Sequence, residues 1–254
     1  MSDLLWLSDR QMAVIAPFFP LAHGVPRVDD RRVVSGIVFV IRNGLRWRDA
    51  PSAYGPHKTL YNRFVRWSRL GVFDRIFAAL AGQAGEPDAI MIDSTHLKAH
   101  RTAASLLKKG MFPRRIGRTK GGLNSKLHTV CDDRGRPLVM LLTEGQMSDH
   151  RGAALMLGAL PRARVLIGDR GYDSRGFRDA LAARGTDACI PSSRSRKIPI
   201  PHDPAVYRRR HRIENLFARL KDWRRIATRY DRCAHTFMAA ITIAAIMIFW
   251  INES

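Results

Sequence analysis

Between residues 89 and 191 the sequence alternates short apolar runs with helical repeats, and this alternation limits the fold more than any other feature. Five runs predict strands: AIMID, KLHTVCDD, PLVMLLTE, RVLIGD and DACIP. Helical periodicity appears at 149–157 and 174–185 and in the basic stretch 207–225. Three strands in a meander followed by alternating helices and strands indicate an α/β fold, in which helices cover a mixed sheet.

The first eighty residues contain three helical patterns. Ser8 and Gln11 have the spacing of a capping box before the first pattern. The third pattern leaves a set of basic residues outside its apolar face: Lys58, Arg63 and Arg66. Short helices closed by a basic helix predict a DNA-binding domain of the helix-turn-helix type over residues 1–80. A small helical bundle with a solvated basic face is the alternative.

A Gly- and Pro-containing stretch at 81–88, AGQAGEPD, predicts the domain boundary, so the second domain is expected over 88–254. Residues 108–122 are basic and rich in glycine, and we expect a mobile loop that can lie against phosphates. Residues 191–204 are rich in Pro, Ser and Arg and predict a linker. The apolar run at 237–251 is too short for a membrane span and predicts a buried helix, either in the core or at a dimer contact.

The charge of the chain indicates its partner. The formal net charge is +21 at pH 7, which is typical of proteins that bind a polyanion such as nucleic acid. An anionic membrane surface is the weaker alternative. The three cysteines, Cys131, Cys189 and Cys233, form no C-x-x-C pair, which argues against a disulfide framework and fits a reducing cytosol. The early acidic residues of the N-terminus do not resemble a secretory signal.

Three acidic residues stand where chemistry is expected. Asp93 closes AIMID, Asp169 closes VLIGD, and Glu214 lies alone within the basic stretch YRRRHRIENLFARLKDWRR. Ligands collect at strand ends in open α/β sheets. On a helical wheel Glu214 shares a stripe with four other side chains: Tyr207, Arg210, Lys221 and Arg225. The simpler alternatives are turn caps for the aspartates and a surface ion pair for Glu214.

Carboxylates that converge without a counter-charge repel one another, and some become protonated. Two divalent ions bound between them would remove that repulsion and would suit phosphodiester chemistry. Because all the ligands would be oxygens, Mg²⁺ or Mn²⁺ is expected rather than zinc. The predicted site is therefore a pair of such ions held by Asp93, Asp169 and Glu214.

The motifs MIDSTHLKAHR and IGDRGYDS, with the spacing Y-x2-R-x3-E-x6-K from Tyr207 to Lys221, resemble the DDE transposases of bacterial insertion sequences. The most similar group is the insertion sequence five family, and LRWRDAP through WSRLGVFDRI is similar to the N-terminal DNA-binding part of the same proteins. The resemblance covers nearly the whole chain.

This resemblance implies a ribonuclease-H-like core in which Asp93, Asp169 and Glu214 bind the two metal ions. It also implies that Tyr172, Arg210 and Lys221 hold DNA near the metals. We expect the other members of the stripe beside Glu214, Tyr207 and Arg225, to contact DNA with them. In the N-terminal domain the expected DNA contacts are Lys58, Arg63 and Arg66. The implied reaction is hydrolysis at the end of the insertion sequence to free a 3′-hydroxyl, which then attacks target DNA. A homodimer on double-stranded DNA in the bacterial cytoplasm, associated with the nucleoid and not with a membrane, is implied in the same way.

Three other interpretations remain open from the sequence. A zinc hydrolase would use His96 and His100 on one face of a helix, joined by some of Asp93, His128, Asp149 and His150. A transposase relic would bind DNA without catalysis. A ribonuclease-H-like nuclease would cut DNA and never join it.

Overall fold

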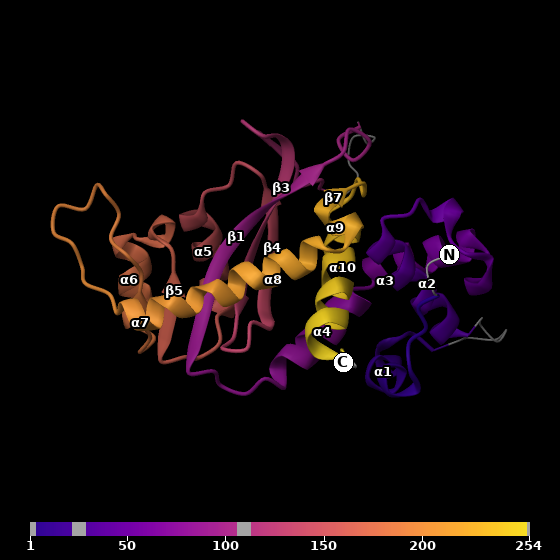
Figure 1. The fold of residues 1–254 in the computed structure, drawn as a ribbon, viewed down its shortest axis with the longest axis horizontal. Coiled ribbons are helices and arrows are strands. Elements are labelled where there is room, and N and C mark those ends of the chain that lie inside the picture. The colour runs from indigo at the N-terminus through magenta and orange to yellow at the C-terminus, as the bar shows by residue number, and fades with distance from the viewer. Residues whose placement is uncertain (1–3, 22–28, 106–112, 253–254) are drawn as a thin grey trace. The chain divides into compact units, whose positions relative to one another are not determined.

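The computed structural model describes residues 4–21, 29–105 and 113–252. Its contacts divide the chain into two compact units (Figure 1). The first comprises residues 1–80, 100–114 and 220–254, and the second comprises 81–99 and 115–219. The expected domains were 1–80 and 88–254, and the units differ from them mainly because residues 220–254 pack with the N-terminal helices.

The first unit is helical. Its α-helices are α1 (Asp9–Ile15), α2 (Asp30–Asn43), α3 (His57–Arg69), α4 (Val72–Gly82), α9 (Arg224–Ala227) and α10 (Ala234–Ala245). Short 3-10 helices lie at Ala16–Phe18, Trp47–Asp49 and Ser52–Tyr54, a π-helix at Ile246–Trp250, and strand β7 at Thr228–Arg229. The predicted capping box of Ser8 and Gln11 is formed. Gly44 ends α2 at φ 69°, a conformation that favours glycine.

Helix α2 is the central helix of this unit. Every residue from 33 to 41 is buried, and α2 packs against α3, α9 and α10. A helix that is buried on all sides has no face left for a partner. By contrast, α3 buries Leu60, Phe64 and Trp67 and leaves Lys58 and Arg66 exposed.

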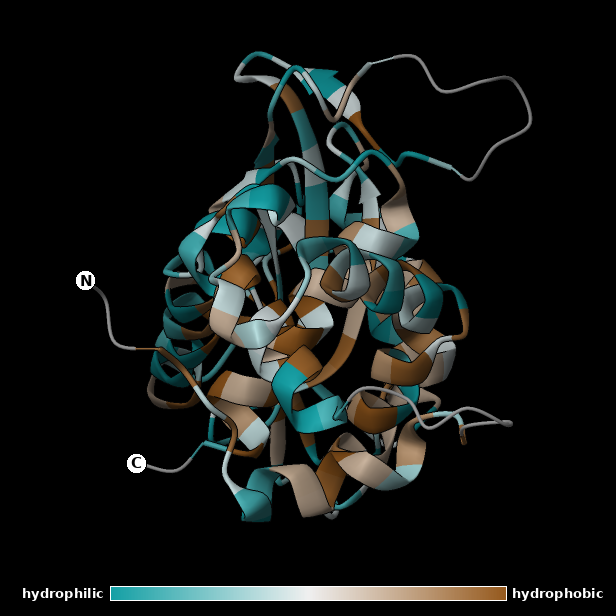
Figure 2. Ribbon diagram, turned by 90° about the vertical axis from the view of Figure 1, so that its right-hand side faces the viewer, coloured by the Kyte–Doolittle hydropathy of each residue, from teal (hydrophilic) through white to brown (hydrophobic). Residues whose placement is uncertain are grey.

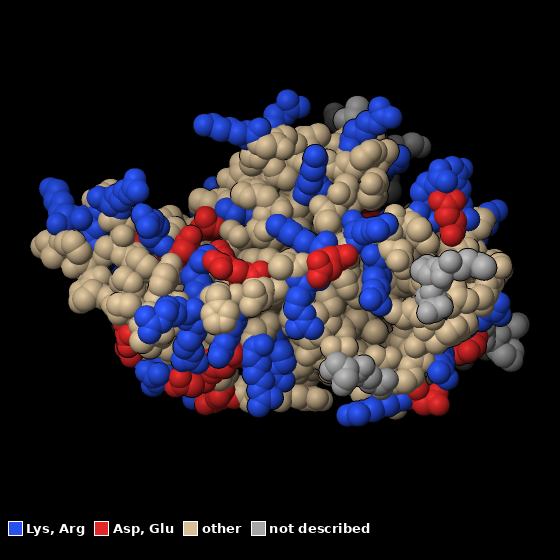
Figure 3. Space-filling model, in the orientation of Figure 1, with Lys and Arg blue, Asp and Glu red and all other residues tan. Residues whose placement is uncertain are grey.

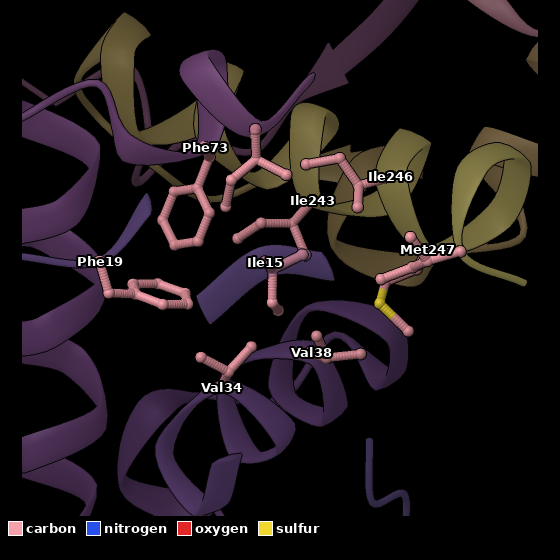
Figure 4. A pocket seen from close by; sticks show the side chains of 10 residues that line it. Ile15, Phe19, Val34, Val38, Phe73, Ile243, Ile246 and Met247 are labelled. Atoms are coloured by element: carbon pink, nitrogen blue, oxygen red, sulfur yellow. The ribbon is translucent and has the colours of Figure 1, made fainter. Parts of the chain in front are cut away.

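The C-terminal helix belongs to the core of the first unit, which confirms the core alternative for 237–251. Residues 239–245 are all buried in α10. Together with α1, α2 and α4, this helix lines a cavity of about 20 Å³ whose labelled side chains are all apolar (Figure 4). A gap of that size and character is a packing defect rather than a ligand site. Within the described residues no helix has both the length and the apolar character that a membrane crossing requires.

The second unit is built on a mixed sheet of β1 (Ala89–Ala99), β2 (Gly117–Thr119), β3 (Gly122–Cys131), β4 (Pro137–Glu144), β5 (Val165–Gly168) and β6 (Asp187–Cys189). The strand order is β2-β3-β1-β5-β6, and β4 also pairs with β3. Strand β3 is antiparallel to its three neighbours β1, β2 and β4, whereas the pairs β1–β5 and β5–β6 are parallel. The predicted α/β fold with a mixed sheet is confirmed.

Helices cover both faces of this sheet. They are α5 (Asp149–Met156), α6 (Arg175–Ala182), α7 (Pro204–Tyr207) and α8 (His211–Lys221), with 3-10 helices at Leu157–Ala159, Arg170–Tyr172 and Arg208–Arg210. In Figure 1, α8 crosses one face of the strands, and α5 lies on the other side. Figure 2 shows hydrophobic residues concentrated on helices and strands and hydrophilic residues along many of the connecting loops.

Three predictions about local structure were wrong. Strand β1 does not end at Asp93 but runs on to Ala99, because the residues after Asp93 pair with β3 as far as Lys98. The predicted loop at 108–122 contains β2, which pairs with Gly122–Asn124 of β3; its residues 108–112 lie outside the described part. The helix expected over 207–225 ends at Lys221, and α9 starts a new helix after Trp223.

Candidate active site

Asp93 and Asp169 lie where the parallel strands β1 and β5 stop pairing. The last registered pair of these strands is Ile92 with Gly168, and each aspartate is the next residue along its strand. Neighbouring strands are about 4.8 Å apart, so this register brings the two acids together. Asp93 therefore marks the end of the parallel pairing rather than the end of β1.

Asp169 also begins the turn that follows β5. Its Oδ1 atom accepts a hydrogen bond of 2.8 Å from the Gly171 amide, which makes Asp169 the N-cap of the short helix Arg170–Tyr172. A Cβ atom at Gly171 would lie 2.8 Å from the same oxygen. The turn-cap interpretation of Asp169 therefore holds, and it is compatible with a place in the site because the cap uses only one carboxylate oxygen.

Glu214 and Asp93 are connected through Arg210. The Nη2 atom of Arg210 lies 2.6 Å from Asp93 Oδ2, and its Nη1 atom lies 2.6 Å from Glu214 Oε1. The side chains of Asp93 and Arg210 are 14% and 18% exposed, whereas that of Glu214 is 57% exposed. Glu214 thus reaches the margin of the sheet from α8, as its helical position predicts, and shares one guanidinium with Asp93.

The charges at this site are unevenly balanced. Burial raises the pKa of Asp93 to about 6, and the carboxylates of Asp169 and Asp149 add to the increase, although Arg210 opposes it. Burial lowers the pKa of Arg210, but the neighbouring carboxylates, with Asp93 the largest influence, outweigh burial and leave that pKa raised. The single positive charge of Arg210 therefore offsets only part of the negative charge of these acids.

Divalent ions fit this group by the chemistry of its donors. Asp93, Asp169 and Glu214 offer only carboxylate oxygens, which Mg²⁺ and Mn²⁺ prefer. In the part of the chain that the structure describes, no three His, Cys, Asp or Glu side chains are close enough together to hold one ion. Arg210 lies between two of the acids instead, and its buried Nε atom has no hydrogen-bond partner. The guanidinium supplies a positive charge where the proposed ligands require one.

A second polar cluster lies on the α5 side of β1, and sequence reasoning missed it as a unit. Ser94 Oγ donates to Asp149 Oδ1 at 2.6 Å, and Lys126 Nζ lies 2.8 Å from the same oxygen. Burial raises the pKa of Asp149, but the bonds from Lys126 and Ser94 outweigh it and the pKa is lowered. The sequence indicates Asp149 only as a possible zinc ligand, because its pairing with Lys126 depends on the sheet register.

The other residues predicted to contact DNA near the acids differ in exposure. Tyr172 is completely buried among Ile90, Ile92 and the helices of the second unit, so its predicted contact with DNA is contradicted. Tyr207 is half-buried and makes an edge contact with the ring of His202 at 5.3 Å. Lys221 is the exposed last residue of α8.

Arg225 is not part of this stripe, because the helix ends before it. Its guanidinium bonds to both oxygens of Asp231 and to the Leu45 carbonyl, and it stacks 5.4 Å from the centre of the Trp47 ring. Only 7% of the Arg225 side chain is exposed. The predicted DNA contact of Arg225 is therefore replaced by a buried structural pair in the first unit.

The zinc interpretation required a helix that carries His96 and His100. His96 lies instead on strand β1, where its Nε2 atom is 3.0 Å from the Gly145 carbonyl. His100 follows the strand, and its Nδ1 atom is 3.0 Å from Thr102 Oγ1. The two rings are therefore not presented on one helix face, which contradicts that interpretation.

Comparison with known proteins finds two family models that together match most of the chain. A family model of the transposase DDE domain matches residues 84–250, and a model of proteins assigned provisionally as transposases of the IS4/5 family matches residues 7–77. The chain is 33% identical over 128 residues to a Brucella ovis protein named provisionally as the transposase for insertion sequence element IS6501. That match covers 50% of this chain and 98% of the relative.

A second relative, from Burkholderia cepacia, is named provisionally as the transposase for insertion sequence element IS402. It is 31% identical over 156 residues, which are 54% of this chain and 72% of the relative. Among solved structures, a piggyBac transposase in its synaptic complex with hairpin DNA is similar with a TM-score of 0.52 and 9% identity. That likeness covers 92% of this chain and 68% of the other, and it concerns the fold.

Proposed function

This chain belongs to the family of transposases with a DDE domain, and we propose that Asp93, Asp169 and Glu214 are its catalytic acids. One observation supports the assignment most directly: a single guanidinium, that of Arg210, joins Asp93 to Glu214, and Asp93 adjoins Asp169 through the strand register. The protein is thus an enzyme of DNA cleavage and transfer, and its proposed acids come from strand β1, the turn after β5 and helix α8.

The three acids would hold two Mg²⁺ or Mn²⁺ ions, which when bound supply activation of the attacking hydroxyl and stabilisation of the leaving oxygen. Asp93 is fixed in β1, where one of its oxygens accepts the Ser94 amide at 2.8 Å. Asp169 is fixed by its cap bond to Gly171. Glu214 is the most exposed of the three, so it is the acid best able to adjust as DNA enters. Arg210, once released from the acids, has two N–H groups available for a phosphate.

We infer that α3 is the helix of the first unit that contacts DNA. Lys58 and Arg66 are exposed on it, whereas Arg63 is half-buried with its guanidinium 5.7 Å from the Trp67 ring centre. Helix α2 offers no comparable face because it is buried throughout its middle. In Figure 3, Lys and Arg side chains are spread over the visible face, and the acids form small groups among them, as expected for a surface that binds a polyanion.

The DNA would be double-stranded, comprising the ends of the insertion sequence and the target. In this proposal Tyr207 and Lys221 contact the DNA end beside Glu214. Bringing two ends together requires two active sites, so a homodimer on DNA is part of the proposal. The place of action would be the bacterial cytoplasm, on the nucleoid.

The test is cleavage of a duplex that carries the element's own end, with Mg²⁺ and a target duplex present. Asp169→Asn is expected to reduce end cleavage by at least about 1000-fold, because an acid that is essential to the reaction is lost. DNA binding, measured by fluorescence anisotropy in EDTA, should stay within about threefold of the parent, since the backbone phosphates dominate affinity. Joined products, seen on a denaturing gel, distinguish a transposase from a nuclease that only cuts.

Asp179→Asn is the matched control. Asp179 lies in the same unit, is 70% exposed, and is 3.8 Å from Arg175 in an ordinary surface pair. This variant should cut at the parent rate. If Asp169→Asn cut as fast as Asp179→Asn, the catalytic assignment would be overturned.

A further inference from the structure

The loop of residues 191–201 leaves the sheet beside the catalytic acids. It follows β6, whose Cys189 is registered with Ile167 of β5 in a parallel pair. Parallel strands end at the same edge of a sheet, so this loop and Asp169 emerge from that edge together. The loop then returns to Asp203, the N-cap of α7, two short turns before Arg210. It therefore links the edge beside the second acid to the helical segment that leads into α8, which carries the third.

The two ends of the 191–201 loop are tied together. Ser192 Oγ accepts the Ile200 amide at 2.7 Å and donates to the Ile200 carbonyl at 3.2 Å. These paired bonds close a neck at the base of the loop. In Figure 1 the closed loop extends away from α6 and α7 at the end of the second unit.

A buried carboxylate also binds the base of this loop. Asp173, whose side chain is 0% exposed, bonds to Arg178 at 2.7 Å, to Arg196 at 2.7 and 2.8 Å, and to the Ser193 amide at 2.7 Å. Arg178 also donates to the carbonyls of Ala188 and Ile190. The arginines hold the pKa of Asp173 well below its usual range. This network holds the base of the loop in place, and Arg196 is paired with Asp173, so its charge is neutralised within the protein.

The tip of the loop is cationic and apolar at once. Arg194 and Lys197 are exposed, and within the described residues neither has an ion-pair partner. Ile198, which follows Lys197 and precedes Pro199, is 81% exposed. No acid occurs between residues 191 and 201. An exposed isoleucine next to two cations without ion-pair partners matches a partner that offers both negative charge and an apolar edge.

We propose that the 191–201 loop binds duplex DNA next to the phosphate that is cut, with Arg194 and Lys197 on backbone phosphates and Ile198 against the sugar and base edges of the minor groove. Duplex DNA offers both features within a few ångströms, and aliphatic side chains wedge between base steps in other minor-groove binders. The proposal rests on the proposed function, because the catalytic acids define which phosphate lies beside the loop. A second copy of the chain is a less suitable occupant, since its surface also carries a large positive charge.

The first experiment removes the two tip cations together. Arg194→Gln with Lys197→Gln should lower the slope of log affinity against log salt by about 1.8, the value for two phosphate contacts. Affinity for the end duplex at low salt should fall at least about 10-fold. Binding is measured by fluorescence anisotropy in EDTA, so the result does not depend on cleavage.

The matched control removes two exposed cations from the opposite edge of the sheet. Arg134 lies in the β3–β4 turn, and Arg162 lines the surface cleft before β5. Arg134→Gln with Arg162→Gln changes the net charge by the same amount, and its salt slope should equal that of the parent. Equal slopes for both double variants would show that only the overall charge matters and would overturn the proposal, as would an unchanged slope for the tip variant.

The second experiment concerns Ile198. A duplex with 2-aminopurine beside the cleaved phosphate should become more fluorescent when the parent protein binds in EDTA, because a wedge unstacks the base. Ile198→Ala should lose most of that increase and keep its affinity within about threefold, since phosphate contacts dominate binding. Leu155→Ala on α5, which removes another exposed aliphatic side chain (64% exposed), should behave as the parent does.

The outcomes separate this proposal from the proposed function. If Asp169→Asn still cut the end duplex, the catalytic assignment would fail, yet the salt slopes would still report on the loop. If the tip variants bound DNA normally but altered the sedimentation of the free protein, the loop would be a contact between copies of the chain and the proposal would be wrong. An Ile198→Ala variant with the parent's fluorescence increase would exclude the wedge.

Discussion

The two faces of the sheet at Asp93 and Ser94 carry polar clusters of opposite character. Successive strand residues point to opposite faces, so Asp93 meets Arg210 of the α8 side, whereas Ser94 meets Asp149 of the α5 side. On the α8 side, three acids (Asp93, Asp169 and Glu214) share one arginine, a formal net charge of −2 from three negative charges and one positive. On the α5 side, Lys126 and Asp149 pair one to one.

This difference indicates that the α8 side carries the proposed active site, whereas the α5 side stabilises the sheet. Lys126 is 8% exposed and is satisfied by Asp149 and by the Met147 carbonyl. Arg210 leaves its buried Nε without a partner, and Asp93 retains a pKa of about 6. A buried cluster whose charges are all paired stabilises the fold, whereas a cluster with excess negative charge can bind cations. We therefore expect substitutions on the two faces to affect activity and stability in opposite ways.

The largest effect should come from neutralising one aspartate on each face. Asp93→Asn should abolish end cleavage, by at least about 1000-fold, and should raise the free energy of unfolding at pH 7 by about 1–3 kcal/mol, because it removes a buried charge. Asp149→Asn should lower the free energy of unfolding by about 3 kcal/mol, because Lys126 is left buried and unpaired. Urea unfolding and end cleavage of both variants measure the two effects. Stability changes of the same sign would contradict the comparison.

The next prediction concerns the closure of the α5 side to water. Burial and the charge of Lys126 lower the pKa of His128 to about 4, although Asp149 opposes them. The unfolded chain takes up this proton near pH 6.5 and the folded chain only near pH 4. Stability should therefore be complete above pH 6.5 and fall by about 3 kcal/mol as the pH decreases to 4.

His128→Gln measures this contribution, because glutamine can still bond to Thr143, whose Oγ1 lies 3.0 Å from His128 Nε2. Urea unfolding between pH 4 and pH 7 should show a dependence reduced by about one proton in the variant. An unchanged dependence would mean that water reaches this face and that the two faces do not differ in closure.

Local sequence patterns were sufficient to single out the three acids and to predict most of the helices and strands. Glu214 could be placed at the margin of a buried face because helical periodicity repeats within a few residues. Asp93 and Asp169 stood out because each follows an apolar run. Gly44, by contrast, is a local signal for a helix end, and no comparable signal marks the break at Trp223. There the helix ends because Trp223 is buried and Arg225 turns to Asp231, a contact that only the packed first unit supplies.

Partners that lie far apart in the sequence could not be found in this way. Lys126 approaches Asp149 because β3 pairs with β1 and α5 packs against β1 and β3. The sequence also gave no sign that Tyr172, which follows Gly171 in the resembling motif, points into the core. The first fact depends on the register of the strands, because a shift of one residue would exchange the two faces. The second depends on how the 3-10 helix Arg170–Tyr172 packs against the core.

The smallest effect should come from Ser94, which is hydrogen-bonded to an acid on each face. The Ser94 amide donates to Asp93 Oδ1 at 2.8 Å, while its hydroxyl donates to Asp149 at 2.6 Å. Ser94→Ala keeps the amide bond to Asp93 and removes the hydroxyl bond that holds residue 94 to Asp149. It should slow end cleavage about 10-fold, because the amide that orients Asp93 is then held less firmly. Ser94→Thr, which keeps the hydroxyl, should restore most of the rate.

Ser125→Ala is the matched control, because Ser125 lies on β3 opposite Leu97 of β1 and donates an equally short bond of 2.6 Å to the Arg115 carbonyl, away from the acids. Each alanine variant should lose about 1 kcal/mol of unfolding free energy, yet only Ser94→Ala should cut more slowly. Because the two losses of stability are matched, a lower rate in Ser94→Ala alone reports the orientation of Asp93. Equal rates in the two variants would mean that the α5 side supports the sheet in general and not the acid on its other face.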